Sequence, residues 1–395
     1  MVLKENGMAR SPLHTKLCDM FDIQYPIILA GMGGISGPIS GPELVAAVSN
    51  AGGLGVLGCV FMAPQEMDEM IRKTKSLTDM PFGVDTVLPA EVPEKGTTAE
   101  FKADLSSLGQ EQDELVKRLV VELGVDKSEP ADSVKEATAG HSMSEQADDK
   151  AWSADLFNQQ IEVILEHRVP VYAAGLGDPG PWVDKLHQHG TKVISVVGHV
   201  RAARKVAQAG VDLIVAQGHE AGGHNSRIAT MPLIPQVVDA VSPTPVVAAG
   251  GIGDGRGLVA ALALGAVGVW CGTIFITTKE SLFEHYLKQN IFRGTEDDTV
   301  VTKVYSGKRM RVMKNALVDA WEKSGVPTLP MPLQSISILP IMDGAFRNER
   351  ADIIPTPAGQ ILGMIKEPKT AKQVIEDMVD GAEKVLAELS TSKAA

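Results

Sequence analysis

The chain has 395 residues, 44 % of them hydrophobic, which is enough for one large α/β domain with an accessory part or for two to three ordinary domains. Its formal net charge of −12 argues against a general nucleic-acid binder and against binding to anionic membranes, because both need basic patches. Three cysteines are too few for a disulfide framework, the segment Met1–Thr15 lacks the apolar core of a signal peptide, and no apolar run reaches the roughly 18 residues of a membrane span. We therefore expect a soluble, cytoplasmic protein.

Short apolar runs alternate with helix-like patterns from residue 25 to residue 290. In chain order, the predicted strands are Tyr25–Met32, Gly53–Gly58, Pro81–Leu88, Val169–Leu176, Lys192–Val197, Asp212–Gln217, Pro245–Gly250 and Gly268–Gly272. The predicted helices are Glu43–Ala51, Pro64–Leu77, Asp155–His167, Pro179–His189, Val200–Ala209, Pro232–Val241, Gly255–Leu264 and Lys279–Asn290. Eight strand–helix units in succession favour a (β/α)8 TIM barrel. The competing fold is an open doubly wound sheet, which more often carries its glycine fingerprint after the first strand.

The interval Pro89–Ser153 interrupts this rhythm between the third strand and the third helix. Residues 91–150 contain 7 basic and 15 acidic side chains, so −8 of the net charge lies in this segment. Its length exceeds that of a plain loop, and Glu114–Leu123 has helical spacing. We predict an acidic helical insertion over residues 89–153, which could be a lid or a surface excursion without function.

The pattern changes again after residue 290. Thr299–Tyr305 is predicted as a strand, Arg311–Lys323 as a helix and Thr370–Glu388 as an amphipathic helix. We expect residues 291–390 to form a mostly helical accessory layer at the barrel mouth. The barrel itself would comprise residues 15–88 and 154–290.

Three glycine-bearing turns follow the last three predicted strands, and two of them have the features of a phosphate site. Gly250 and Gly251 lie in the run that leads into the seventh predicted helix, where backbone N–H groups uncrowded by Cβ atoms can bind an anion. Gly272 and Thr273 add a further N–H and a hydroxyl after the eighth strand. Each turn alone could be a tight connection with nothing bound. The last two loops of a barrel are adjacent, however, so both could bind one phosphate.

His224 follows Gly222 and Gly223 after the sixth predicted strand. The two glycines would let a flat ring approach the backbone, and a histidine in such a cleft suits proton abstraction near neutral pH. A structural histidine bonded to a neighbouring loop is the alternative. His219 and Glu220 raise the further alternative of a metal site, but their spacing matches no helical zinc signature, and we expect no metal.

Four more residues end the first, third and sixth predicted strands. Gly31 and Met32 form a glycine-rich turn in which Met32 could cover one face of a bound ring. Asp85 could point into the same mouth or be a capping or surface carboxylate. Gln217 could hydrogen-bond a polar ring edge.

These motifs resemble the nitronate monooxygenase (2-nitropropane dioxygenase-like) family of FMN-dependent TIM barrels. The similarity covers roughly residues 15 to 281 and is most specific at 220–224, 248–257 and 268–273, while Ala358-Gly-Gln360 resembles the closing motif of the family. The resemblance implies FMN across the strand ends, with His224 as the catalytic base. By the same resemblance, the cofactor-binding residues are Gly31, Met32, Asp85, Gln217, Gly222, Gly223, Gly250, Gly251, Gly272 and Thr273.

Three departures from the family pattern point to a distinct substrate. Asp85 stands where the family often has Asn, Asn225 and Ser226 replace a frequent glycine, and the 89–153 insertion is longer than usual. The resemblance implies oxidation of alkyl nitronates with O2 to carbonyl compounds and nitrite. Its partners would be a small-molecule substrate and O2, and a homodimer is left open.

Two other functions remain as alternatives. FMN-dependent enoyl-acyl-carrier-protein reductases share the Glu-Ala-Gly-Gly-His and Ala-Ala-Gly-Gly-Ile runs, so an NAD(P)H-dependent reductase of enoyl thioesters or quinones is the first. The acidity of the insertion disfavours docking of an acidic carrier protein. The second alternative is a flavin-free barrel that serves as a binding scaffold.

Overall fold

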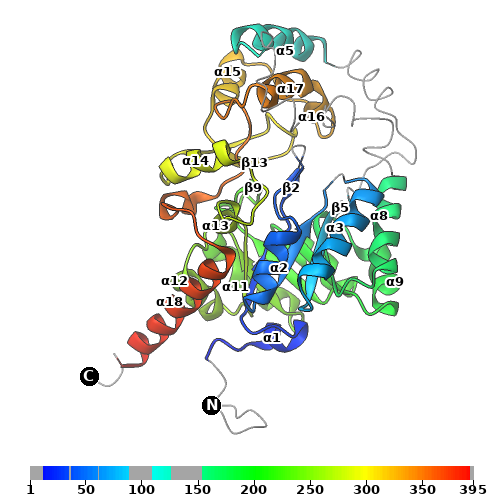
Figure 1. Cartoon of the computed structure of the whole chain (residues 1–395), viewed down its shortest axis with the longest axis vertical. Coiled ribbons are helices and arrows are strands. Elements are labelled where there is room, and N and C mark those ends of the chain that lie inside the picture. Colours follow the sequence, from blue (N-terminus) through cyan, green and yellow to red (C-terminus); the bar gives the residue numbers. More distant parts are fainter. Residues whose placement is uncertain (1–11, 35–36, 61, 89–108, 126–153, 392–395) are drawn as a thin grey trace.

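The computed structural model describes residues 12–34, 37–60, 62–88, 109–125 and 154–391. Its centre is a barrel of eight parallel strands (Figure 1). These are β1 (Ile27–Leu29), β4 (Gly55–Gly58), β5 (Phe82–Leu88), β6 (Val171–Gly177), β7 (Lys192–Val197), β8 (Leu213–Gln217), β10 (Val246–Ala249) and β11 (Val269–Cys271). The strands neighbour one another in the order β1-β11-β10-β8-β7-β6-β5-β4, and backbone hydrogen bonds between Leu54 and both Ile27 and Leu29 close the ring. The predicted (β/α)8 barrel and all eight predicted strands are confirmed.

The strands are almost continuously apolar because both of their faces are buried. Alternate residues, such as Ile28, Val215 and Val247, form one cluster that fills the barrel. Their neighbours in the chain, such as Ile27 and Ile214, belong to the larger cluster between the strands and the surrounding helices. An alternating polar face would leave one of these two layers without its apolar contacts.

Helices surround the barrel in the order that the sequence predicts, up to the seventh unit. They are α2 (Pro42–Asn50), α3 (Pro64–Leu77), α8 (Ala154–Glu166), η1 (Gly180–Trp182) with α9 (Val183–Gln188), α10 (Val200–Gln208), α11 (Thr230–Val241) and α12 (Gly255–Ala263). Helix α1 (Lys16–Phe21) precedes the first strand, and its residues Leu17 and Phe21 pack against the cluster inside the barrel.

The eighth surrounding helix differs from the prediction. Residues 279–284 are not helical, and α14 (His285–Arg293) begins only after them. Instead, the C-terminal helix α18 (Ala371–Thr391) packs against both α12 and α2, as Figure 1 shows for α12. The segment before α14 contacts the start of α18, where Glu280 Oε2 accepts a hydrogen bond of 3.0 Å from Ala371 N. Periodicity alone cannot show which of two amphipathic helices fills this gap.

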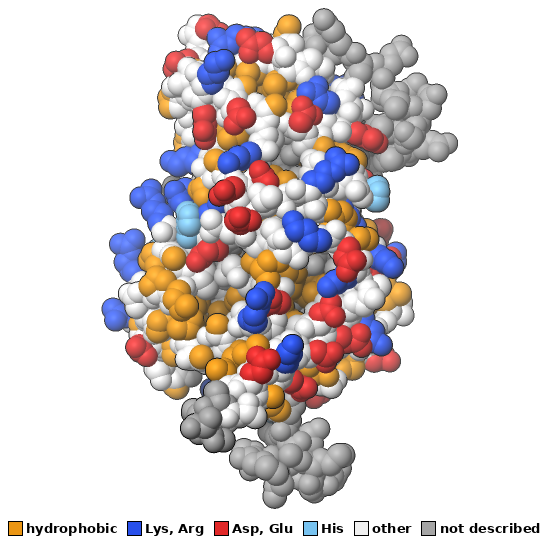
Figure 2. Space-filling view, turned by 90° about the vertical axis from the view of Figure 1, so that its left-hand side faces the viewer, with side chains coloured by type: hydrophobic (Ala, Val, Ile, Leu, Met, Phe, Trp, Pro, Cys, Tyr) orange, Lys and Arg blue, Asp and Glu red, His pale blue; other side chains and the backbone are white. Residues whose placement is uncertain are grey.

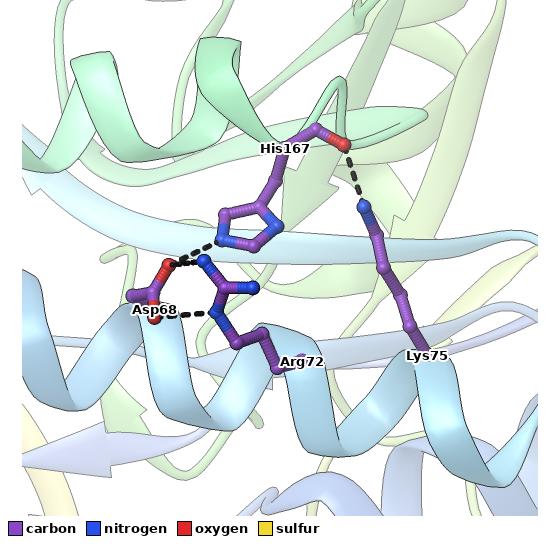
Figure 3. A network of polar contacts seen from close by, with 4 residues as sticks. All are labelled: Asp68, Arg72, Lys75 and His167. Atoms are coloured by element: carbon purple, nitrogen blue, oxygen red, sulfur yellow. Dashed lines mark hydrogen bonds and ion pairs between the residues drawn. The ribbon is translucent and has the colours of Figure 1, made fainter.

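A polar network joins α3 to the residue that follows α8, His167 (Figure 3). Asp68 accepts hydrogen bonds from Arg72 Nε at 2.7 Å and lies 2.7 Å from His167 Nε2. Lys75 Nζ donates to His167 O at 2.7 Å. The hydrogen bonds from Arg72 and His167 lower the pKa of Asp68 to about 2, so this carboxylate keeps its charge across the ordinary pH range.

A second layer covers the C-terminal ends of the barrel strands. It contains β12 (Thr299–Thr302), β13 (Met310–Met313), α15 (Ala316–Ser324), α16 (Leu333–Ser337), α17 (Leu339–Arg347) and η2 (Gln360–Met364). The predicted strand at Thr299–Tyr305 is present at Thr299–Thr302. The predicted helix Arg311–Lys323 was wrong in its first turn, because Arg311 pairs within β13 and the helix begins only after Asn315, whose Oδ1 accepts from Val318 N at 3.1 Å.

Only part of the predicted insertion belongs to the described residues. Helix α5 (Gln110–Glu122) overlaps the predicted helical stretch and packs against α15, α16 and α17 at the top of the molecule (Figure 1). Two hydrogen bonds fix it there, from Gln112 Nε2 to Pro327 O at 2.8 Å and from Arg350 Nη1 to Leu123 O at 2.7 Å. Residues 89–108 and 126–153 lie outside the described part, so the extent of the insertion and the domain boundaries stay predictions.

Acidic and basic side chains are mixed across the face in Figure 2 rather than gathered by sign. In the part of the chain that the structure describes, no helix combines the length and apolar character needed to cross a membrane.

The crossing of α12 and α18 yields a test of this packing. A Cβ atom on Gly255 would lie 2.1 Å from Ala382 N, whereas one on Gly381 would meet nothing nearer than 3.5 Å. Gly255→Ala should therefore lower the free energy of unfolding by about 1–3 kcal/mol through overpacking. Gly381→Ala, at the same crossing, should raise it by up to about 1 kcal/mol because alanine favours the helix. Urea denaturation followed by circular dichroism measures both, and equal effects of the two variants would contradict the assigned packing.

Candidate active site

A cavity of about 300 Å³ lies between the C-terminal ends of the barrel strands and the second layer. Every predicted site residue lines it: Gly31, Met32, Asp85, Gln217, Gly222, Gly223, His224, Gly250, Gly251, Gly272 and Thr273. The structure therefore brings together residues from five strands, β1, β5, β8, β10 and β11, and from the turns that follow them. Such a position is where barrel enzymes carry their active sites.

The loop that carries His224 is held by the second layer on one side and by the barrel on the other. Residues Gly223 and His224 form a short strand, β9, that pairs antiparallel with β13, so that Met310 lies opposite His224. On the barrel side, Gln217 Nε2 at the end of β8 donates to His224 O at 2.5 Å. Gly223 has φ +67°, which favours glycine, and a Cβ on Gly222 would lie 2.7 Å from the backbone of Ala358. Both glycines are thus needed to bring the imidazole into the cavity wall.

Arg311 is a buried cation that fixes the loop between β8 and His224. The sequence analysis did not select it as a site residue. Its Nη2 donates to His219 Nε2 at 2.9 Å and to His219 O at 3.0 Å, while Nη1 donates to Thr299 Oγ1 at 2.9 Å. A guanidinium can only donate, so His219 Nε2 accepts, and its Nδ1 lies 3.3 Å from Ser226 O. His219 is thereby engaged in structure rather than in binding.

Glu220 has a structural partner as well. Its carboxylate accepts from Thr230 N at 2.9 Å and from Thr230 Oγ1 at 2.7 Å, at the start of α11. Because His219, Glu220 and His224 have different partners, they do not converge on one point. Within the described residues, no group of three or more His, Cys, Asp or Glu side chains is arranged to hold a metal ion.

His224 is a titratable group in the wall of the cavity. Its Nε2 lies 2.9 Å from Ser306 Oγ, a buried hydroxyl that sequence reasoning did not select. Burial, with a smaller contribution from the positive charge of Lys308, lowers the pKa of His224 to about 4. The imidazole is therefore neutral near pH 7 and able to accept a proton. No local sequence pattern indicates this partner, because Ser306 and His224 are 82 residues apart in the chain.

The glycine turns after β10 and β11 form a cradle at one end of the cavity. Gly250 and Gly251 have φ of +96° and +75°, and a Cβ on Gly251 would lie 3.3 Å from Glu220. Within the described residues, no acceptor takes the N–H of Gly251 or Thr273. Thr273 Oγ1 accepts from Gly359 N at 3.0 Å, which ties the closing motif to this turn.

The start of α12 offers fewer free N–H groups for an anion than the sequence suggested. Asp254 caps this helix, since its Oδ1 accepts from Arg256 N at 2.9 Å and from Gly257 N at 3.4 Å. The N–H groups of the first turn are thus already bonded to a carboxylate. Among the described residues, N–H groups without an acceptor are instead those of Gly251, in the turn before the cap, and Thr273, at the start of the short helix α13 (Thr273–Ile276).

Asp85 lies in the wall of the cavity rather than on the surface. One carboxyl oxygen accepts from Gly175 N at 2.9 Å. The other makes no hydrogen bond within the described residues and is not among their buried unpartnered atoms, so it opens on to the cavity. Burial raises the pKa of this carboxyl well above its usual range, which favours the neutral acid, a hydrogen-bond donor.

The roof of the cavity is apolar and comes from the second layer. Its side chains, which sequence reasoning also missed, include Met310, Met331, Ile338, Met342 and Phe346. No Lys or Arg is among the described residues that line the cavity, and its acidic residues are Asp85 and Glu220. An anionic ligand must therefore be bound by backbone amides and hydroxyls, with an apolar part beneath the roof.

Comparison with known proteins agrees with this geometry. The model of the nitronate monooxygenase family matches residues 14–381. The chain belongs to the nitronate monooxygenase family. It is similar to a Mycobacterium tuberculosis protein named as a monooxygenase, with 37 % identity over 353 residues that cover 86 % of this chain and 90 % of the relative.

The chain is also similar to two oxidoreductases with different names. The (3aS,4S,5R,7aS)-5-hydroxy-7a-methyl-1-oxo-octahydro-1H-indene-4-carboxyl-CoA dehydrogenase of Rhodococcus jostii is 35 % identical over 316 residues, covering 80 % of this chain and 70 % of the relative. The solved structure of nitroalkane oxidase from Streptomyces ansochromogenes aligns with a TM-score of 0.74 and 26 % identity, covering 94 % of this chain and 99 % of that chain. Membership of the family identifies the protein as an oxidoreductase.

The low pKa of His224 predicts a pH dependence of stability. The folded-state pKa, about 4, is below the ordinary value of 6.5, so between these pH values the unfolded chain binds more protons than the folded one. Stability should therefore fall as the pH falls from 6.5 to 4, by on the order of 2 kcal/mol from this group. His224→Gln should lack this component, whereas His285→Gln, at an exposed position on α14, should follow the wild-type curve. Urea unfolding at several pH values measures the difference, and parallel curves for wild type and His224→Gln would contradict the assignment.

Proposed function

We propose that this member of the family is an FMN-dependent nitronate monooxygenase, which oxidises alkyl nitronates with O2 to carbonyl compounds and nitrite. One observation carries the proposal: a neutral histidine stands in the wall of a cavity that has an amide cradle at one end and an apolar roof. The neutral histidine can accept a proton, the amide cradle suits the phosphate of a cofactor, and the apolar roof suits an alkyl substrate.

The residues present fit FMN. The N–H groups of Gly251 and Thr273, which have no acceptor among the described residues, suit its phosphate. At Gly223, where a Cβ would meet nothing within 4 Å, there is room for its ring system next to the backbone. Asp85, as a neutral acid, would donate to a polar edge of the ring, and Met32 would cover part of one face. When bound, FMN would take an electron from the nitronate and pass it to O2.

His224 supplies the proton transfer that a neutral nitroalkane requires. The bond between the α-carbon and its hydrogen breaks, the proton moves to the imidazole, and the electron pair moves into the nitro group to give the nitronate. A substrate that is already a nitronate needs no base. The apolar roof excludes water and offers contacts to the alkyl chain, each buried methylene contributing about 0.8 kcal/mol.

A reductase of thioesters is the second candidate. It is favoured by one observation, the similarity to a dehydrogenase of a carboxyl-CoA ester. In this case NAD(P)H would reduce the bound flavin, and the apolar roof would receive the acyl group. Anaerobic mixing with NADH and then NADPH separates the two functions, because rapid bleaching of the flavin band would favour the reductase and a persistent band the oxygenase.

The base role of His224 has a direct test. His224→Gln should lower kcat/KM for a neutral nitroalkane by about 10²-fold or more, the usual contribution of a general base, while turnover of the preformed nitronate changes little. Oxygen uptake and nitrite release measure both reactions, and flavin absorbance checks that FMN is retained. His285→Gln is the matched control. Full activity of His224→Gln on the neutral nitroalkane would remove the base assignment.

A further inference from the structure

The hydroxyl of Ser306 lies where the upper layer meets the imidazole of His224. Ser306 Oγ is 2.9 Å from His224 Nε2, 3.2 Å from Lys308 O and 3.3 Å from Lys308 N. Met310 Sδ is 3.8 Å away. Since Ser306 is buried, its single proton and its lone pairs are distributed among these partners.

Counting donors and acceptors decides between the two possible arrangements. If His224 carries its proton on Nε2, this N–H donates to Ser306 Oγ, the hydroxyl donates to Lys308 O, and Lys308 N–H also donates to Ser306 Oγ. Every partner is then used. If Nε2 is instead bare, the hydroxyl must donate to it, and Lys308 O loses that donor. The first arrangement makes one more hydrogen bond, worth about 1 kcal/mol.

The second ring nitrogen has different surroundings. His224 Nδ1 makes no hydrogen bond with the described residues, yet it is not one of their buried unpartnered polar atoms. It therefore opens on to the cavity that His224 lines. In the first arrangement, Nδ1 carries the free lone pair.

We propose that Ser306 is a positioning residue that holds His224 in the Nε2–H tautomer, so that Nδ1 is the atom that takes the α-proton. This inference rests on the proposed function. The proton leaves the α-carbon for Nδ1, the electron pair stays on the nitronate, and the imidazolium formed keeps its Nε2–H···Oγ bond. The carbonyl of Lys308 accepts the hydrogen bond from the serine hydroxyl throughout. The positive charge of the imidazolium therefore faces the oxygen of Ser306 and, behind it, the carbonyl oxygen of Lys308.

The full chain loaded with FMN tests the proposal by nitrogen NMR. In protein labelled with ¹⁵N-histidine, long-range ¹H–¹⁵N correlations distinguish a protonated ring nitrogen from a bare one, and the His224→Gln variant identifies the signals of His224. Wild type should show Nε2 protonated and Nδ1 bare. Ser306→Ala should give a mixture of tautomers, and Ser306→Thr, which keeps the hydroxyl, should restore the wild-type form.

Kinetics give a second, independent comparison. Ser306→Ala should lose about ten-fold in kcat/KM for a neutral nitroalkane, equivalent to about 1.4 kcal/mol, while turnover of the preformed nitronate stays close to wild type. Ser337→Ala is the matched control, because its hydroxyl also donates to a backbone carbonyl, Gln334 O at 2.9 Å, but lies outside the cavity. Equal losses on both substrates would assign Ser306 a merely structural role and overturn the proposal.

The outcomes separate this proposal from the function on which it rests. A wild-type spectrum with bare Nε2 overturns the tautomer assignment whatever the enzyme oxidises, and this result does not require that Ser306→Ala folds. An unchanged tautomer in Ser306→Ala overturns the role of the serine. Absence of wild-type turnover with both nitro compounds would instead remove the proposed function, while the spectrum still decides how His224 is held.

Discussion

The pairing of β9 with β13 is the interaction on which the site depends. The barrel supplies β8 and the glycines, but the segment that carries His224 pairs with strand β13, which follows it in the chain by more than eighty residues. Arg311 strengthens the same contact from within the hairpin, with hydrogen bonds to His219 and Thr299. Because Arg311 is buried, loss of any of these acceptors would leave a guanidinium N–H without a hydrogen bond, which costs free energy.

Low charge is the second property that organises the cavity. His224 is kept neutral by burial, and Asp85 is shifted towards its neutral form by the same cause. Glu220, the remaining acidic lining residue among those described, faces the hydroxyl and amide of Thr230. Hydrogen bonds to amides, hydroxyls and a neutral acid are stronger in such surroundings than in water, which suits the recognition of a polar ring by donors rather than by ion pairs.

The sequence predicts the barrel and most of the residues in the cavity wall, because both leave local signals in the chain. The buried strands are continuous apolar runs, and Gly250 or Gly223 mark turns that need positive φ. Ser306 and Arg311 leave no such signal, because their role arises from a pairing between distant segments. The roof residues Met342 and Phe346 look like ordinary apolar positions of a helix, and only the packing of α17 over the cavity distinguishes them. Asp254 shows a different limit of the sequence. The start of helix α12 was predicted correctly, but the carboxylate of Asp254 itself accepts hydrogen bonds from the backbone N–H groups that were expected to bind an anion.

The position of α18 has a consequence for how the molecule assembles. This helix closes the outer ring between α12 and α2, so the first and last elements of the barrel are brought together by a segment that is synthesised after the whole upper layer. Contacts between segments so far apart in the chain carry a large loop-closure cost and slow the final step of folding. During synthesis, the apolar faces of α2 and α12 therefore stay exposed until α18 has left the ribosome, and this seam is where chaperones or aggregation would act first.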